Sequence, residues 1–285
     1  MEIDGQTRLA AVIANPINHS LSPFIHNLAF NLTNTKGVYL AFTVEQANLK
    51  ASLDSIKALN MYGVNVSMPY KREIIPYLDE LSEDARLIGA VNTIVFKDDK
   101  LQGCNTDGSG FVKSLGSYEL DGKNMLILGG GGASLAIIVA SIKENIKTIS
   151  VFNRKSDHFI DLSLKLRELS EKMEVEIKLF DLADKEQLDK IIQQSDLLVN
   201  ATSVGMDGVS LPLPKETVFP KDFLLVDIIY KPLKTPLLKL GENQGIKTMN
   251  GLAMLVNQAA QSFKMWTGKE MPVDIIEERL EKRLK

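Results

Sequence analysis

The segment 125–154, MLILGGGGASLAIIVASIKENIKTISVFNR, constrains the fold of this chain more than any other stretch. It starts with an apolar run typical of parallel strands that are buried on both faces. A glycine turn follows, then a helix expected to begin near Ala133, then a second apolar strand over 148–152. Strand, turn, helix and strand within about thirty residues form one βαβ unit, which predicts an α/β fold with a parallel sheet.

The glycine turn favours binding of a phosphate group. It consists of Gly129, Gly130, Gly131 and Gly132. Glycines let backbone N–H groups approach a bulky anion, and the helix starting near Ala133 points its positive end at the same place. The dinucleotide fingerprint has glycine at its first, third and sixth places, and here Ser134 takes the sixth. A pyrophosphate fits this arrangement; the alternative is a tight turn that binds no ligand.

The residues after the second strand favour NADP over NAD. A cofactor without a 2′-phosphate usually meets an acidic residue there, whereas this chain has Asn153, Arg154 and Lys155. Two cations and an amide suit a ribose 2′-phosphate, and the flat guanidinium of Arg154 can also stack on adenine. Asp157 is close enough in sequence to offer a carboxylate to a plain ribose, so use of both cofactors stays open. A solvated basic loop is the alternative.

Length and composition predict an ordinary globular enzyme of two domains. The chain has 285 residues, 45% of them hydrophobic and 24% charged. A net charge of −3 gives no basic excess for nucleic acid, and there is no apolar run long enough for a membrane span. The acidic N-terminus does not suit a secretory signal. A single cysteine, Cys104, excludes an internal disulfide and a multi-cysteine metal site, and the three histidines share no metal-ligand spacing. We expect a cytoplasmic protein without a metal.

Strands and helices alternate along the rest of the chain, which predicts parallel sheets. Before the glycine turn we expect strands over 9–14, 38–44 and 63–66, helices over 22–34, 46–59 and 72–81, and a hairpin across 97–100. After it we expect helices over 157–172, 185–193, from near 235, over 252–266 and over 273–284, and strands over 175–180, 196–200 and 223–227. Ser22 followed by Pro23 predicts an N-cap and a first helical residue.

Nine motifs, in order along the chain, resemble those of the shikimate dehydrogenase family and its quinate/shikimate dehydrogenase relatives. They are HSLSP at 19–23, NVSMPYK at 65–71, GAVNT at 89–93, NTDGSG at 105–110, GGGGAS at 129–134, FNR at 152–154, NATSVGM at 200–206, DIIYKPLKTPLL at 227–238 and NGLAMLVNQAA at 250–260. One such match could arise by chance, whereas nine at family-like spacing are specific. The resemblance implies NADP-linked, reversible reduction of 3-dehydroshikimate to shikimate on the route to chorismate and the aromatic amino acids.

The resemblance also implies the domain organisation. An N-terminal α/β substrate domain with a mainly parallel sheet is expected to comprise residues 1–112 and 250–285. A Rossmann-like, doubly wound nucleotide domain is expected over 113–249, with a cleft between the two. The expected partner is a small molecule of the shikimate or quinate type, not a nucleic acid or a membrane, and a homodimer is left open.

Lys71 is the preferred candidate for proton transfer. Hydride reduction of a ketone puts negative charge on oxygen, and a nearby cation that can also release a proton lowers that barrier. A lysine can be tuned for this role, whereas an arginine could not titrate. Lys71 matches the catalytic lysine of the family, and Asp107, as a carboxylate, would hold its ammonium group. The alternative for Lys71 is a solvated lysine at the protein surface. The alternative for Asp107 is a helix N-cap, a role that it can combine with holding Lys71.

The remaining site residues are implied by the resemblance alone. Substrate contacts match at Ser20, Ser22, Ser67, Asn92, Tyr230 and Gln258, with Ser20 and Ser22 at the carboxylate-binding positions. Cofactor-side positions match at Glu83, Ile228 and Gly251. Ser67 stands where the biosynthetic enzymes often have threonine, and this departure, together with the stretch NRKSDHF at 153–159, favours the quinate/shikimate branch and leaves the substrate range and the cofactor preference open. A catalytically silent nucleotide-binding protein is the remote alternative.

Overall fold

The computed structural model describes residues 2–285, which form two compact units. The first unit contains residues 2–110 and Val256–Arg283, and the second contains Phe111–Leu255. The boundaries fall inside two helices, α4 (Asp107–Ser114) and α9 (Leu252–Thr267). The first unit is therefore built from both ends of the chain, and the second from one continuous segment.

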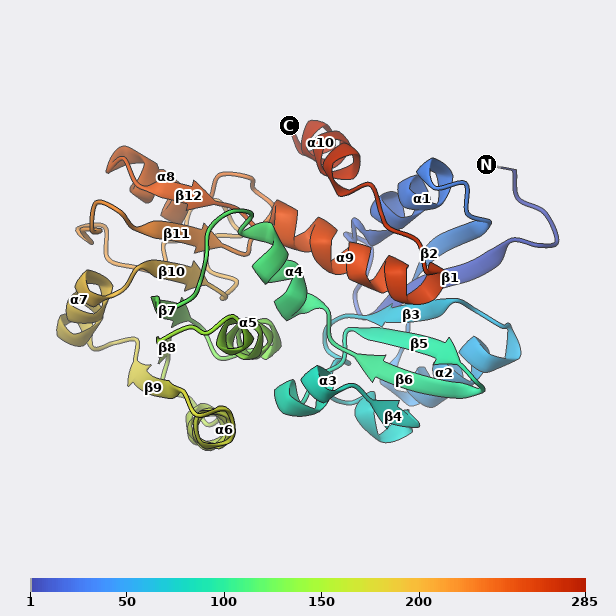
Figure 1. Ribbon diagram of the computed structural model, residues 1–285, viewed down its shortest axis with the longest axis horizontal. Helices are drawn as coiled ribbons and strands as arrows, with labels where there is room; N and C mark the ends of the chain where they lie inside the picture. The colour runs from blue at the N-terminus through green and yellow to red at the C-terminus, as the bar shows by residue number, and fades with distance from the viewer. Residues whose placement is uncertain (1) are drawn as a thin grey trace. The chain divides into compact units, whose positions relative to one another are not determined.

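A six-stranded mixed sheet forms the centre of the first unit (Figure 1). Its order is β2 (Gly37–Thr43), β1 (Arg8–Ala14), β3 (Gly63–Val66), β5 (Thr93–Lys97), β6 (Lys100–Cys104) and β4 (Glu80–Leu81). Only β5 runs against the other five strands. The helical segments of this unit are α1 (Ser22–Leu32), η1 (Gln46–Asn48), α2 (Leu49–Ala58), η2 (Ile75–Tyr77), α3 (Glu83–Ile88) and α10 (Val273–Leu284).

The helix predicted over 72–81 is wrong. The segment forms turns, the short η2 and the edge strand β4, and a true helix, α3, follows it. Asp79 explains the difference, because its backbone N–H donates to the Leu101 carbonyl at 3.0 Å and its carboxylate accepts from the Leu101 N–H at 2.7 Å. These bonds draw the chain onto β6. Pro76 also lacks the N–H that a continuous helix needs.

The predicted cap of α1 is also wrong. The helix begins at Ser22 itself, with Leu21 at the cap position and without a side-chain cap hydrogen bond in the part of the chain that the structure describes. The Ser22 N–H instead donates to the Ser20 hydroxyl at 3.3 Å, so the two serines meet where the loop enters the helix.

Helix α9 completes the first unit. Trp266 donates its indole N–H to the Ile94 carbonyl at 3.0 Å. Gly63 makes room for this contact, because a Cβ there would lie 2.2 Å from both the Ile94 carbonyl oxygen and the Trp266 Nε1 atom. Close by, the ring of His26 is stacked on Tyr39, with 4.3 Å between the ring centroids.

An all-parallel six-stranded sheet forms the second unit. Its order is β12 (Lys247–Met249), β11 (Leu224–Asp227), β10 (Leu197–Asn200), β7 (Asn124–Leu128), β8 (Thr148–Asn153) and β9 (Glu176–Asp181). Figure 1 shows α5 (Gly132–Lys143) and α6 (Phe159–Met173) on one side of this sheet, and α7 (Lys185–Gln194) and α8 (Pro236–Asn243) on the other. This confirms the predicted doubly wound, Rossmann-like fold. The strand order reverses between β7 and β10, and ligands of such sheets bind beyond the strand ends at that point.

Candidate active site

The glycine turn lies at the end of β7, where the strand order reverses. Gly129 has φ of +101°, and its N–H donates to the Phe152 carbonyl at 2.8 Å. A Cβ on Gly129 would lie 3.0 Å from the Thr202 methyl carbon, so both the conformation and the space favour glycine. At Gly131, by contrast, nothing described apart from its chain neighbours lies within 4 Å of the Cβ position. The turn is therefore uncovered on the side where the α5 N-terminus presents its amides.

Ser134 accounts for the missing third glycine of the fingerprint. Its side chain is fully buried, and its hydroxyl donates to the Gly129 carbonyl at 2.7 Å. A small side chain that bonds back to the turn can thus pack between helix and strand where glycine is usual.

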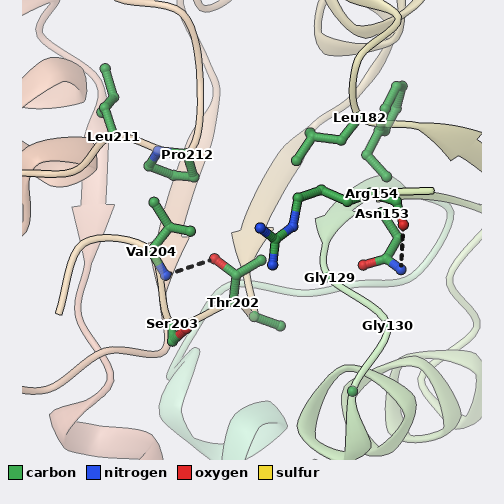
Figure 2. A pocket seen from close by; sticks show the side chains of 13 residues that line it. Gly129, Gly130, Asn153, Arg154, Leu182, Thr202, Ser203, Val204, Leu211 and Pro212 are labelled. Carbon is green, nitrogen blue, oxygen red and sulfur yellow. Dashed lines mark hydrogen bonds between the residues drawn. The ribbon is translucent and has the colours of Figure 1, made fainter. Parts of the chain in front are cut away.

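A hollow of about 350 Å³ lies beyond these strand ends, and we call it the nucleotide hollow. It is lined by Gly129, Gly130, Gly131, Phe152, Asn153, Arg154, Leu182, Ala201, Thr202, Ser203, Val204, Leu211 and Pro212. Figure 2 shows the Arg154 side chain extending into it on the side of Thr202. An uncovered glycine turn, helix amides and a guanidinium are the groups that a dinucleotide with its phosphates requires, so the residues present fit that cofactor.

The loop after β10 forms one wall of the nucleotide hollow and is held by Asn200. Its side-chain oxygen accepts from the Thr202 hydroxyl at 2.7 Å, and its amide donates to the Val204 carbonyl at 3.2 Å. The Thr202 hydroxyl in turn accepts from the Val204 N–H at 3.1 Å (Figure 2). We did not predict a role for these residues from the sequence. The polar run NATS directly after a buried strand was the signal.

Asp227 ties this loop to the segment that follows β11. It is fully buried, and its carboxylate accepts from the Asn200 amide at 3.0 Å, the Ile229 N–H at 3.1 Å and the Thr235 hydroxyl at 2.7 Å. Burial raises the pKa of Asp227 despite these donors. Burial also raises the pKa of the Tyr230 hydroxyl, which lies in the same segment.

Gly251 packs against the backbone next to this segment. A Cβ there would lie 1.8 Å from the Ile228 carbonyl oxygen, a clash that only a backbone shift could relieve. The contact explains why residue 251 is a glycine without reference to any ligand. It also places Gly251 beside Ile228, which the resemblance likewise implies to be a cofactor-side position.

The basic residues after β8 have an acidic neighbour that the sequence did not indicate. Lys155 lies 3.6 Å from the Asp181 carboxylate, at the end of β9. A second hollow of about 390 Å³ is lined by Arg154, Lys155, Asp181, Leu182 and Ala183. Asp157, the carboxylate that we expected near the ribose, is exposed and is not among the described residues that line either hollow.

Lys71 and Asp107 meet within the first unit, although 36 positions separate them. The Lys71 Nζ atom lies 2.5 Å from one oxygen of Asp107, and the other oxygen accepts from the Asn92 amide at 2.7 Å. The Asp107 side chain is 9% exposed and that of Lys71 is 24% exposed, so the ammonium is the accessible member of the pair. A backbone hydrogen bond helps to position Lys71, because its carbonyl accepts from the Val91 N–H at 2.7 Å.

A buried polar network supports this pair. It consists of Asn65, Asn92, Thr93, Thr106 and Ser262. Asn65 donates to Thr93 and Ser262 at 3.1 Å each, and the Thr93 hydroxyl donates to Asn92 at 2.9 Å. Tyr39 joins the network by donating to Asn65 at 2.7 Å. A continuous chain of hydrogen bonds thus links Tyr39 to Asp107. Among its members, only Asn92 and Asp107 were predicted as site residues.

The remaining predicted residues are distributed over both units. Ser20, Ser67 and Gln258 are partly buried in the first unit, and Gln258 packs so closely on α4 that a Cβ at Gly110 would lie 2.7 Å from its backbone nitrogen. Glu83 is an exposed residue at the start of α3 and belongs to the first unit, not to the unit with the glycine turn.

Two kinds of feature are absent from residues 2–285. They contain no group of three or more His, Cys, Asp or Glu side chains that could hold a metal ion. None of the described helices is both long and apolar enough to cross a membrane.

A Rossmann-like sheet with an uncovered glycine turn, together with a lysine–carboxylate pair on a separate α/β unit, defines a dinucleotide-linked dehydrogenase. Residues 12–94 match the shikimate dehydrogenase substrate binding domain, and residues 251–281 match the shikimate 5′-dehydrogenase C-terminal domain. The chain belongs to the shikimate dehydrogenase family.

Similar proteins cover the whole chain. Shikimate dehydrogenase (NADP(+)) of Lactococcus lactis subsp. cremoris (strain MG1363) is 54% identical over 286 residues, covering 100% of both chains. Shikimate 5-dehydrogenase from Listeria monocytogenes, solved with shikimate and NAD, is 43% identical with a TM-score of 0.93 and 98% of each chain covered. The Thermus thermophilus enzyme, solved with NADP(H) and shikimate, is 33% identical with a TM-score of 0.84, covering 97% of this chain and 99% of its own. These findings confirm the resemblance and the fold predicted from the sequence.

Proposed function

We propose that this protein is an NADP-linked shikimate dehydrogenase that reversibly reduces 3-dehydroshikimate to shikimate on the route to chorismate and the aromatic amino acids. The observation that carries the proposal is the Lys71–Asp107 contact, a partly exposed ammonium held by a buried carboxylate. The family membership of the whole chain supports it.

Lys71 is the proton donor in this proposal. Bound NADPH supplies the hydride, which leaves negative charge on the former ketone oxygen. The Lys71 ammonium stabilises that charge and transfers its proton to the oxygen, and in the reverse direction the neutral amine accepts the proton from the substrate hydroxyl. Asp107 is fixed by Asn92 and holds the lysine in place, so this arrangement does not have to be created at the moment of reaction.

The remaining predicted residues bind the two ligands. Ser20, Ser22, Ser67, Asn92, Tyr230 and Gln258 contact the substrate, with Ser20 and Ser22 at its carboxylate. Hydroxyls can bind that anion without adding a cation that would compete with Lys71. Gly129, Gly130, Gly131, Gly132 and Ala133 offer backbone amides to the pyrophosphate, and Asn153, Arg154 and Lys155 face the 2′-phosphate. Glu83, Asp157, Ile228 and Gly251 complete the proposed cofactor contacts.

Ser67 favours a second candidate function. At a position where the biosynthetic enzymes often have threonine, the smaller serine leaves room beside the substrate ring. A broader quinate/shikimate dehydrogenase that also uses NAD is therefore the alternative to a strict NADP-linked biosynthetic enzyme.

Three further points belong to the proposal. The first unit is the substrate domain, and the second is the nucleotide domain. The enzyme is cytoplasmic, which is supported by Cys104, a free and buried thiol. It forms a homodimer, which is supported by Leu40 and Phe42, exposed on the edge strand β2 of the first sheet.

Initial rates with purified protein test the proposal. Absorbance at 340 nm is followed with shikimate or quinate as substrate and NADP⁺ or NAD⁺ as cofactor. We expect the highest kcat/KM for shikimate with NADP⁺. Comparable values for quinate and NAD⁺ would favour the second candidate. A folded sample without any shikimate-dependent signal would contradict both and support a catalytically silent nucleotide-binding protein.

A further inference from the structure

The 2′-phosphate end of the proposed cofactor site contains an acidic side chain that cannot help to bind a phosphate. Asp181 is the last residue of β9 and lies directly opposite Asn153 in the parallel ladder between β8 and β9. Its side chain is 24% exposed and lines the second hollow together with Arg154 and Lys155. The carboxylate therefore lies among the cations expected to meet the 2′-phosphate.

Contacts at both carboxylate oxygens hold Asp181 in this place. One oxygen accepts from the Ala183 N–H at 3.0 Å, which fixes the side chain at the turn after β9. The other lies 3.6 Å from the Lys155 Nζ atom. The Lys155 side chain is 71% exposed, so the pair itself adds little stability. Its effect is electrostatic, because it partly neutralises one of the two cations of the subsite.

We infer that Asp181 is a specificity-determining residue that limits the preference for NADP over NAD by pairing with Lys155. The inference rests on the proposed function and deepens it. A ribose 2′-phosphate carries between one and two negative charges and gains from every free cation within a few ångströms. A ribose without the phosphate gains little from the Lys155 ammonium. The Lys155–Asp181 pair therefore weakens binding of NADP and leaves binding of NAD almost unchanged.

Direct binding of cofactor fragments to the full-length protein tests this inference without turnover. Adenosine 2′,5′-bisphosphate and 5′-AMP are titrated calorimetrically into the wild type and into Asp181→Asn. Removing one negative charge near the phosphate should tighten binding of the bisphosphate about threefold to tenfold at low salt. Binding of 5′-AMP should change less than about twofold, because it lacks the group that Lys155 would meet. The ratio of kcat/KM for NADP⁺ and NAD⁺ should shift in the same direction.

Two control variants make the result specific. Asp189→Asn, at an exposed position on α7, causes the same change in net charge and should leave both affinities unchanged. In a Lys155→Gln background, Asp181→Asn should lose the part of its effect that comes from freeing the Lys155 ammonium, and should keep only the relief of direct repulsion between the carboxylate and the phosphate.

Distinct outcomes separate this inference from the proposed function. Equal tightening of both fragments, no tightening, or a full effect in the Lys155→Gln background would each overturn the inference while leaving the dehydrogenase intact. A wild type that neither binds the bisphosphate nor oxidises shikimate would overturn both.

Discussion

In the first unit the candidate catalytic side chains are tied into buried hydrogen bonds, whereas in the second unit the candidate cofactor side chains line an open hollow. Asp107 is held by Asn92, and the polar network continues from there to Asn65 and Ser262. Arg154 is exposed and extends into the nucleotide hollow (Figure 2). The first arrangement fixes a proton donor in advance, and the second leaves charged and amide groups free to meet a ligand.

This difference implies that substitutions at the Lys71–Asp107 pair and substitutions in the nucleotide hollow should change different kinetic constants. Substitutions at the Lys71–Asp107 pair should act mainly on kcat, because they remove an interaction that is strongest in the transition state. Substitutions in the nucleotide hollow should act mainly on the KM for the cofactor, because they remove binding that persists throughout the reaction.

The largest effect is expected for Lys71→Ala. It should lower kcat by about 10²-fold to 10⁴-fold with little change in the KM for shikimate, since the proton donor is lost. Steady-state kinetics with NADP⁺ measure this, and titration with adenosine 2′,5′-bisphosphate should show unchanged affinity. Lys71→Arg is the matched control, because it keeps the charge but cannot release a proton. It should also have a low kcat. Recovery of most activity with arginine, or a loss seen only in KM, would contradict the role of Lys71.

The effect of Arg154→Ala should be the next largest. Loss of the guanidinium should raise the KM for NADP⁺ about tenfold to a hundredfold, with kcat nearly unchanged and a much smaller effect with NAD⁺. Arg167→Ala provides the comparison, because Arg167 is an exposed arginine of the same unit that pairs with Glu171 on α6. It should leave both constants unchanged. An equal rise in KM for both cofactors would mean that Arg154 does not recognise the 2′-phosphate.

Asn65→Ala tests the polar network through stability. Asn65 accepts from Tyr39 and donates to Thr93 and Ser262, so its removal leaves buried groups without partners. The free energy of unfolding should fall by about 1–3 kcal/mol, measured by urea denaturation. Asn31→Ala, at an exposed position on α1, should change it by less than about 0.5 kcal/mol. Equal effects of the two variants would mean that the network does not stabilise the unit.

His26→Phe should have the smallest effect at neutral pH. The ring is fully buried and stacked on Tyr39, and neither ring nitrogen has a hydrogen-bond partner among the described residues. Burial lowers the pKa of His26 to about 3, so below pH 6.5 the unfolded state binds a proton that the folded state does not. Wild-type stability should therefore fall with acidification, by roughly 1.4 kcal/mol per pH unit from this residue.

The His26→Phe variant should lack the loss of stability on acidification that His26 causes. Urea unfolding at pH 7.5 and pH 5.0 measures it, with the wild type and His158→Phe, an exposed histidine, as references. A variant with the same acid sensitivity as the wild type would show that His26 is protonated in the folded state.

The same contrast explains how much could be predicted from the sequence. In the second unit four strands, β7, β8, β10 and β11, are buried apolar runs. The alternation of strands and helices also follows chain order in a doubly wound sheet, so the fold and the glycine turn could be predicted. The short β12, with only three residues, was missed. Hydrophobic periodicity alone was enough there because the contacts are regular.

The first unit was harder because its organisation depends on long-range contacts. The local pattern of the segment 72–81 predicts a helix, but Asp79 binds Leu101 on a neighbouring strand. The partnership of Asn65 with Ser262 links positions 197 residues apart, and an asparagine inside a buried strand gives no direct indication of its partner. For Asp181 the obstacle was similar, because its proximity to Lys155 appears only when β8 and β9 are paired.

The contact of Trp266 with Ile94 and Gly63 has a consequence for the order of events during protein synthesis. All six strands of the first sheet lie before residue 105, yet Ser262 and Trp266, which bond to them, are synthesised only after the whole segment Phe111–Leu255. The intervening segment, Phe111–Leu255, is continuous and can fold as soon as it has emerged. A nascent chain can thus complete its second unit first, and premature termination anywhere before α9 yields a product whose Lys71 and Asp107 lack a completed support.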